Sequence, residues 1–283
     1  MAPAENPAFW PLTLIVFLPA LVAAGLSLPI FPKAREEIIR WITFATTAIV
    51  FLLSLWVAVP QFFGTAGAGQ FVVGQPEMQG VVKLPWIESF GIEYLLGVDG
   101  ISLPLVVLTT IISMLAIAAS WPIKKHVKAY HVLFLLLETG MLGVFVSLDF
   151  FLFYVFWEVM LLPMYFLIGV WGGPRREYAA IKFFLYTLFG SVLMLIAILM
   201  LYFTSDVRLL TDEQLIATHV VQPAVAAQDI SSIRSAESAV HTFNLMALAA
   251  VGQLPNSPFA TTTIWLGMSL ETWAFLLLLI GFV

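Results

Sequence analysis

Cysteine is absent from this chain of 283 residues. Its absence excludes disulfide bonds, thiol catalysis, iron–sulfur ligation and thiolate zinc sites together. Charged residues make up only 10% of the chain, and the net charge is -5. No basic cluster exceeds a few residues, so the sequence offers no positively charged surface to bind a polyanion such as nucleic acid. The Gly-rich fragment 67–69 stands alone and is not a phosphate-binding motif. We therefore expect neither nucleic-acid binding nor a nucleotide or redox site here, and any cofactor must be held elsewhere.

What remains is apolar sequence, which makes up 61% of the chain. Such a composition excludes an ordinary soluble domain and predicts an all-α, multi-pass membrane protein. Each predicted span holds about 20 residues, which at about 1.5 Å per residue matches a hydrocarbon core of about 30 Å. Six complete spans are predicted: Phe9 to Phe31, Trp41 to Phe62, Ser102 to Trp121, Tyr130 to Leu148, Phe150 to Trp171 and Ala179 to Phe203. Residues 9–62 thus hold the first two spans, and residues 102–204 hold the next four.

The positive charges predict an orientation. Nine of the twelve Lys and Arg lie in alternate connections: Lys33, Arg35, Arg40, Lys124, Lys125, Lys128, Arg175, Arg176 and Lys182. The three others, Lys83, Arg208 and Arg234, lie in the opposite set. The positive-inside rule then places the N-terminus, with its short tail of residues 1–8, on the outer side. The first apolar run is also too long for a cleaved signal peptide, so it is expected to be a retained span.

Two long outer segments interrupt the spans. Residues 63–101 show partial alternation of apolar and polar side chains, which suggests a short β-hairpin. Residues 205–262 contain one helix start signal, Thr211-Asp212-Glu213, followed by a tract without clear period. Residues 263–283 predict the start of a seventh span, with a helix beginning near Ser269 that would cover only about 20 Å. The chain then either ends inside the membrane or, as we expect, is the front part of a longer protein that continues through that span.

Glu158 is the first candidate functional residue. It lies near the middle of the fifth span, where a charged side chain costs about 2.5–3.5 kcal/mol and is kept when it faces a protein interior or a water path. Pro163 follows five residues later and has no amide hydrogen, so the carbonyl of Val159 loses its helical partner and becomes available to water. Charge and loosened backbone coincide, as a proton relay requires.

Several strings in the chain resemble one known family. They are Leu-Gly-Val-Asp-Gly-Ile-Ser-Leu-Pro-Leu at 96–105, Leu-Glu-Thr-Gly-Met-Leu-Gly at 137–143, Phe-Trp-Glu-Val-Met-Leu-Leu-Pro-Met-Tyr-Phe-Leu-Ile-Gly-Val-Trp-Gly-Gly at 156–173 and Ala-Ala-Ile-Lys-Phe-Phe-Leu-Tyr-Thr at 179–187. The region 90–204 resembles the antiporter-like subunit M (chain 4 type) of proton-translocating NADH:quinone oxidoreductase, respiratory complex I. Mrp-type cation/proton antiporter subunits and membrane subunits of energy-converting hydrogenases are similar in spans five and six. The Met-Leu-Leu-Pro-Met-Tyr-Phe-Leu-Ile run favours subunit M.

The resemblance implies a function and its parts. The fold would be an incomplete antiporter-like complex I subunit in a bacterial inner membrane, partnered by the other antiporter-like and membrane-arm subunits. The family's span-five glutamate, which gates a half-channel by pairing with a lysine on a broken span seven, matches Glu158. No lysine occurs after Lys182, so these 283 residues alone should not pump. NADH, flavin, iron–sulfur clusters and quinone would be bound by partner subunits, whose electron transfer supplies the energy.

Other polar residues carry two interpretations each. Glu138 lies within the fourth span and is either on a proton path or a structural acid with its hydrogen bonds satisfied. His131, seven residues earlier on about the same face, is more typical of an interfacial side chain. Asp149 lies at the turn between spans four and five, where capping of a helix N-terminus is the plainer interpretation. Lys182 either extends toward the membrane surface or serves proton uptake at the inner side. A Mrp-type sodium/proton antiporter subunit and a non-transporting structural membrane subunit remain alternatives for the whole chain.

Overall fold

The computed structural model of this chain describes residues 9–28, 36–58, 71–72, 78–222 and 226–282. Some of the features expected from the sequence lie outside these ranges. They are the N-terminal tail 1–8, the cations Lys33 and Arg35, the last residues of the second predicted span and the Gly-rich fragment 67–69.

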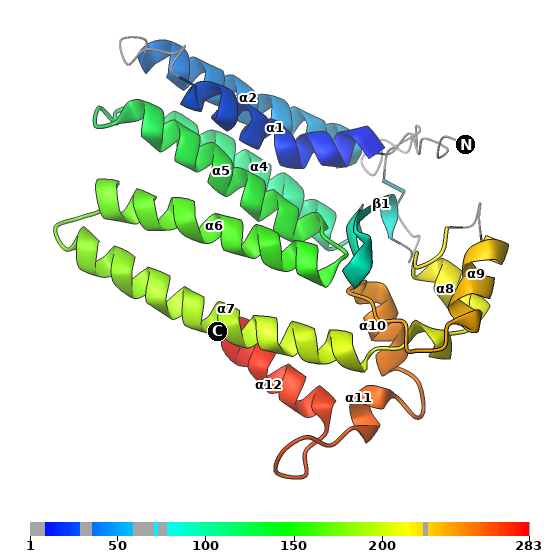
Figure 1. The fold of residues 1–283 in the computed structure, drawn as a ribbon. Coiled ribbons are helices and arrows are strands. Elements are labelled where there is room, and N and C mark those ends of the chain that lie inside the picture. The colour runs from blue at the N-terminus through cyan, green and yellow to red at the C-terminus, as the bar shows by residue number, and fades with distance from the viewer. Residues whose placement is uncertain (1–8, 29–35, 59–70, 73–77, 223–225, 283) are drawn as a thin grey trace. The chain divides into compact units, whose positions relative to one another are not determined.

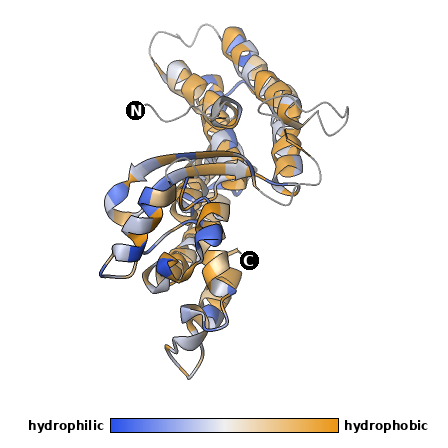
Figure 2. Cartoon of the chain, turned by 90° about the vertical axis from the view of Figure 1, so that its right-hand side faces the viewer, coloured by the Kyte–Doolittle hydropathy of each residue, from blue (hydrophilic) through white to orange (hydrophobic). Residues whose placement is uncertain are grey.

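Long apolar helices dominate the described residues (Figure 1), and Figure 2 shows them coloured as hydrophobic along most of their length. Five are long and apolar enough to cross a membrane: α2 (Glu36–Ala58), α4 (Ser102–Ala119), α5 (Val127–Val146), α6 (Phe150–Trp171) and α7 (Arg176–Thr204). Two further helices, α1 (Phe9–Ser27) and α12 (Leu270–Phe282), are also apolar, but their apolar stretches, Pro11–Ser27 and Leu270–Phe282, are shorter. The chain is thus a mostly helical, multi-pass membrane protein.

The predicted spans and the observed helices differ mainly at their ends. The fifth predicted span coincides with α6, whereas α7 begins three residues before the sixth, at Arg176. The first predicted span, Phe9 to Phe31, corresponds to α1, whose described helix ends at Ser27. Five described helices therefore meet the length of a full span, rather than the six expected.

The chain divides into two compact units, which are described separately: residues 1–82, 96–147 and 155–184 form unit 1, and residues 83–95, 148–154 and 185–283 form unit 2. In unit 1, helix α1 packs on α2 and α5, and α4 packs on α2 and α5. A buried cluster of Ala23, Leu26, Ile39 and Leu135 joins α1, α2 and α5. Basic side chains bind the ends of these helices: Lys128 donates to the Leu28 carbonyl (2.8 Å), and Arg40 to that of Ile123 (2.8 Å). Cations near helix C-termini stabilise the helix dipole.

Helices α5 and α6 approach closely in unit 1 because two glycines on α5 leave space. A Cβ atom at Gly143 would lie 2.3 Å from ring atoms of Phe156, and one at Gly140 would lie 2.5 Å from Cγ of Met160. Small residues let helix backbones approach in a membrane, where packing replaces the hydrophobic effect as the force that joins helices. The glycine face of α5 is therefore the face that contacts α6.

Strands β1 (Gln79–Ile87) and β2 (Ile92–Val98) form a two-stranded sheet within the segment where the sequence suggests a hairpin. A short 3-10 helix, η2 (Glu88–Phe90), connects them and ends at Gly91, which has φ +63°. In unit 2, Lys83 on β1 forms an ion pair with Glu93 on β2 (2.9 Å) and donates to the backbone carbonyls of His219 and Val220 (2.9 and 2.6 Å). The hairpin is thereby fastened to the long segment that follows α7.

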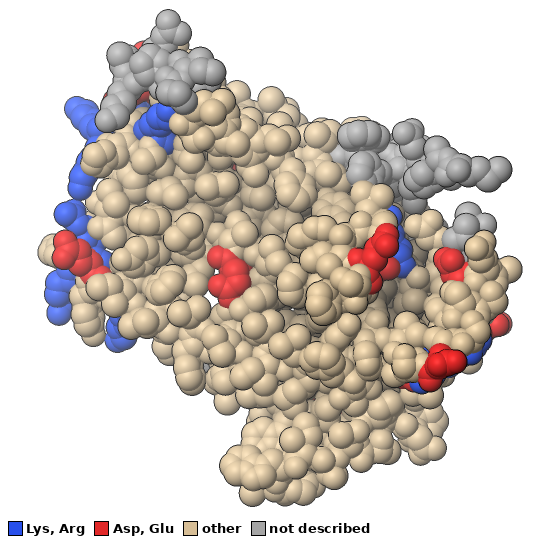
Figure 3. All heavy atoms as spheres, in the orientation of Figure 1, with Lys and Arg blue, Asp and Glu red and all other residues tan. Residues whose placement is uncertain are grey.

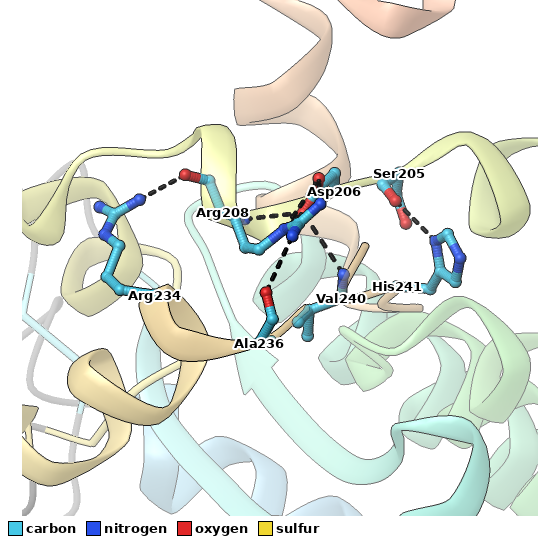
Figure 4. A network of polar contacts seen from close by, with 7 residues as sticks. All are labelled: Ser205, Asp206, Arg208, Arg234, Ala236, Val240 and His241. Atoms are coloured by element: carbon cyan, nitrogen blue, oxygen red, sulfur yellow. Dashed lines mark hydrogen bonds and ion pairs between the residues drawn. The ribbon is translucent and has the colours of Figure 1, made fainter. Parts of the chain in front are cut away.

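That segment is largely ordered by short elements: η3 (Val207–Leu209), α8 (Asp212–Ala217), α9 (Ala226–Ser235), α10 (Leu245–Gly252) and α11 (Pro258–Thr261). The start signal at Thr211 corresponds to the N-cap of α8, which forms a capping box with Gln214. Figure 4 shows the polar network that holds the segment against the end of α7. In it, Arg208 pairs with Asp206 (2.7 Å) and donates to the Ala236 carbonyl (3.0 Å), while His241 Nδ1 contacts the Ser205 carbonyl (2.6 Å). In this segment, charged side chains form hydrogen bonds with backbone carbonyls of the turns, which are not paired in a helix or a sheet.

Candidate functional site

Glu158 is the one charged residue in α6. Its helix forms because the run is almost continuously apolar. Pro163 is the one helix-breaking residue in it, and it removes one backbone donor about one turn beyond the acid. The structure leaves the Glu158 side chain half-buried and its neighbour Val159 38% exposed. Glu158 therefore lies at the boundary between the interior of unit 1 and its surface.

Glu138 occupies a different environment, the interior of unit 1. Its side chain is 0% exposed, and neither carboxylate oxygen has a hydrogen-bond partner among the described residues. An ionised carboxylate without partners is too costly to bury, so the group must hold a proton or bind water. Among the described residues, Glu138 is therefore not an acid that is fixed by structural hydrogen bonds.

Other buried polar atoms share that interior. Ser113 on α4 and His131 and Thr139 on α5 are each at most 4% exposed, and each has a side-chain atom without a partner in the described part of the chain. His131 precedes Glu138 by about 10 Å along the helix, and it is enclosed by helices rather than exposed at a surface. Ser54 and Thr110 supply a further polar contact, 2.8 Å between α2 and α4. Buried groups of this kind are the usual partners of internal water.

The two acids do not face one another. Phe156 and Met160 form the face of α6 that meets α5, and Glu158 lies about 200° around the helix from Phe156, at about 100° per residue. Glu138 is likewise turned away from Gly140 and Gly143. The acids therefore lie on opposite sides of the contact between α5 and α6. Farther along the face of Glu158, Tyr165 contacts the ring of Phe184 on α7, with centroids 5.5 Å apart.

Lys182 lies on α7 with an exposed side chain, and its ammonium is 5.9 Å from the centroid of the Tyr178 ring. The structure therefore gives Lys182 a contact within its own helix, one turn back. Figure 3 shows blue basic side chains gathered toward the ends of helices, where long side chains can reach a membrane surface.

Asp149 begins α6 and is 1% exposed. Its Oδ1 accepts from the amides of Phe151 and Leu152, both at 2.9 Å, and its Oδ2 accepts from the amide of Glu93 at 3.1 Å. These contacts match the capping interpretation of the sequence and also tie the hairpin to α6 within unit 2. Burial nevertheless raises the pKa of Asp149 to about 6, because desolvation outweighs the bonds that favour the carboxylate.

Sequence reasoning missed part of this site. Ser113 and Thr139 are ordinary small polar residues, each in an apolar helix, and attract no notice in the sequence. Helical spacing gives the one signal that could have found them: Thr110 and Ser113 repeat on α4 at the interval that places them on one face. That this face of α4 is buried becomes known only from the structure, in which Thr110 and Ser113 are at most 1% exposed.

Apolar helices with one buried and one half-buried acid are compatible with the class of antiporter-like membrane proteins, and the comparisons support this class. A family model described as "NADH-ubiquinone oxidoreductase chain 4, amino terminus" matches residues 41–148, and "NADH:quinone oxidoreductase/Mrp antiporter, TM" matches residues 147–282. The chain belongs to this family, within its subunit M or chain 4 branch.

Individual relatives give the same result. NADH-quinone oxidoreductase subunit M of Rhodobacter capsulatus is 45% identical over 193 residues, which cover 68% of this chain and 35% of that protein. The chain thus spans about a third of the length of the curated relatives it matches. Respiratory complex I from Thermus thermophilus with bound NADH contains a chain of similar fold, with a TM-score of 0.63 and 23% identity, covering 96% of this chain and 43% of that one. The Mrp complex from Dietzia sp. DQ12-45-1b is similar in fold at a TM-score of 0.52 and 22% identity, over 67% and 19% of the two chains.

Proposed function

We propose that this chain forms part of a membrane-arm subunit of NADH:quinone oxidoreductase that couples electron transfer from NADH to quinone to proton pumping. Glu158 gates its half-channel. The supporting observation is a single half-buried carboxylate in the middle of α6, one turn from a proline, in a chain of the subunit M family. We further propose a bacterial inner membrane, with the N-terminus outside, as its location.

The chemistry follows from the carboxyl group. In general, an apolar surrounding favours the neutral form of a carboxyl group and a nearby ammonium favours the carboxylate, so in this proposal the movement of a cation toward or away from Glu158 makes it release or take up a proton. The carbonyl freed by Pro163 can order water beside the acid. No lysine occurs after Lys182 within these 283 residues, so the cation is not assigned to a residue of this chain.

Glu138 is the second candidate on the proton path. Its burial without partners, together with the polar side chains of Ser113, His131 and Thr139, supports water-mediated transfer through unit 1. We assign Lys182 to proton uptake at the inner side on its position near the start of α7. NADH, flavin, iron–sulfur clusters and quinone belong, in this proposal, to partner subunits.

The decisive experiment replaces Glu158 in the assembled complex. Glu158→Gln keeps the shape of the side chain and removes its titratable proton. We expect proton pumping per NADH oxidised, measured in inside-out membrane vesicles, to fall at least about tenfold, the usual scale for loss of a positioned acid–base group. Glu158→Asp, which keeps a carboxyl group, should retain measurable pumping.

Glu213→Gln provides the matched control, because Glu213 is an exposed acid on α8 outside the membrane helices. It should pump normally. Unchanged pumping in Glu158→Gln, with the complex assembled, would reject the gating role and favour a non-transporting structural subunit.

A Mrp-type sodium/proton antiporter subunit is the alternative function, favoured by the family model that spans both groups and by the similar fold in the Mrp complex. The two functions differ in their driving reaction. An antiporter would move protons in response to a sodium gradient in vesicles without NADH, whereas the proposed subunit would not.

A further inference from the structure

A small hairpin precedes α12 in unit 2, and we call residues 263–269 the apolar finger. Thr263 and Ser269 form an antiparallel bridge, the amide of Ile264 donates to the Met268 carbonyl (3.2 Å), and that of Met268 donates to the Trp265 carbonyl (3.2 Å). The two residues at the tip, Leu266 and Gly267, have φ of +56° and +70°, the pattern of a tight type I′ hairpin turn. A leucine rarely adopts this conformation, so the turn holds an apolar side chain at a position that usually carries Asn or Gly.

The finger exposes large apolar side chains. Ile264, Trp265 and Leu266 are 51%, 65% and 71% exposed. No charged residue occurs between Glu237 and Glu271, so the finger and the sequence before it are electrically neutral. Surfaces of this composition are not typical of a loop in water.

The finger also folds back along α12. The ring of Trp265 stacks on that of Trp273, with centroids 5.8 Å apart and 25° between the planes, and Trp273 Nε1 donates to the Trp265 carbonyl at 3.1 Å. Trp273 lies two residues beyond Glu271, on the apolar side of the only charge in the first turn. Trp265 therefore lies at the depth of the first apolar turn of α12.

We propose that the apolar finger is an interfacial membrane anchor that inserts into the lipid leaflet at the start of α12. Tryptophan and leucine at the end of an apolar helix are the side chains that prefer the boundary between headgroups and hydrocarbon. The finger meets part of a second requirement of that location, because the amides of Ile264 and Met268 are bonded within the hairpin and so are not left as unpaired donors in lipid. The finger continues the exposed apolar surface of α12, to which Phe275 (63%) and Ile280 (54%) belong, so the same lipid would cover both.

The absence of cysteine from these 283 residues makes the test direct. A nitroxide label is attached to Leu266→Cys in the assembled, membrane-embedded complex, and the signal of the complex without the added cysteine is subtracted. Power saturation then compares collisions with oxygen, which concentrates in the bilayer, and with a water-soluble nickel chelate. Ser238→Cys, exposed in the same connecting segment, is the aqueous control, and Ile196→Cys, 43% exposed on α7, is the bilayer reference.

We expect the ratio of oxygen to nickel accessibility to be at least about fivefold higher at position 266 than at 238 and to approach that at 196, as for a side chain at the acyl boundary. Nickel accessibility at 266 equal to that at 238 would place the finger in water and overturn the proposal. Protection of 266 from both reagents would show that another protein covers the finger, which also overturns it. Repeating the measurement at Trp265→Cys guards against a local disturbance of the turn, and the same oxygen preference is expected there.

Discussion

Glu138 and Glu158 lie on neighbouring helices of one unit, yet their surroundings differ in almost every respect. Glu138 is 0% exposed in the interior of unit 1, and neither of its carboxylate oxygens has a hydrogen-bond partner among the described residues. Glu158 is half-buried on the opposite side of the contact between α5 and α6. One acid is thus fully enclosed by its own chain, whereas the other is partly exposed on α6.

The difference explains how one short piece of chain can hold two acids without strong repulsion between them. Close approach of two carboxylates would favour a shared proton and couple their titrations. Because α5 and α6 pack through Gly140, Gly143 and the side chains of Phe156 and Met160, the acids are separated by packed apolar groups. We therefore expect the two acids to respond independently to substitution.

The largest effect is expected from breaking that packing. Gly143→Leu places a Cβ atom 2.3 Å from the Phe156 ring, so the helices must separate or Phe156 must leave its site. Overpacking of this severity costs about 3 kcal/mol of unfolding free energy. Thermal unfolding of the full chain in lipid should show the loss. Gly25→Leu is the control, since nothing lies within 4 Å of a Cβ atom there; equal losses in both variants would contradict a tight contact between α5 and α6.

A smaller effect separates the acids themselves. Glu138→Met replaces an unpartnered buried carboxyl with an apolar group of similar size, so the unfolding free energy should rise by about 2 kcal/mol. Glu158→Met should change it by less than about 0.5 kcal/mol, as is usual for a partly exposed site. Reversible unfolding in mixed micelles measures both. Strong destabilisation by Glu138→Met would mean that hydrogen bonds to the carboxyl group, through water, help to hold unit 1 together.

Much of the fold could be predicted because hydropathy and span length are local properties of the sequence. The α6 boundaries were predicted to the residue, since the run Phe150–Trp171 is apolar apart from Glu158 and is flanked by turn-forming sequence. The short helices of residues 205–262 could not be predicted, because they depend on side-chain contacts such as Arg208 with the Ala236 carbonyl. Their sequence carries little periodicity of its own.

The candidate site was predictable in its residue types but not in its geometry. A charge within an apolar span identifies Glu138 and Glu158 directly. The side of the helix bundle that each acid faces depends on which helices pack together, and two glycines on α5 decide that. Lys182 shows the limit of prediction from sequence. Its position near the start of α7 suggested a role in proton uptake, and its contact with Tyr178 neither supports nor tests that role.

Asp149 offers the smallest and most local comparison, an acid that is as buried as Glu138 but accepts three backbone hydrogen bonds. Burial raises its pKa from 3.8 to about 6, so the folded state keeps a proton that the unfolded chain has released. Stability of the junction between β2 and α6 should therefore be highest below about pH 4, fall as the pH rises to about 6, and stay constant above that. Glu93, whose pKa burial also raises, and Lys83, which pairs with Glu93, are the charged groups beside it.

Hydrogen exchange at the Glu93 amide, which donates to Asp149, reports this junction. After correction for the intrinsic effect of pH, exchange should become about tenfold faster between pH 4 and pH 7, equivalent to about 1.4 kcal/mol. That is less than the full pKa shift implies, because a local opening leaves Asp149 partly enclosed. Asp149→Asn keeps an oxygen that can cap α6 and removes the titrating group, so it should abolish the pH dependence while leaving the helix start intact. A pH dependence that persists in Asp149→Asn would assign the titration to Glu93 instead, and the hydrogen bonds of the cap, rather than burial, would then dominate at Asp149.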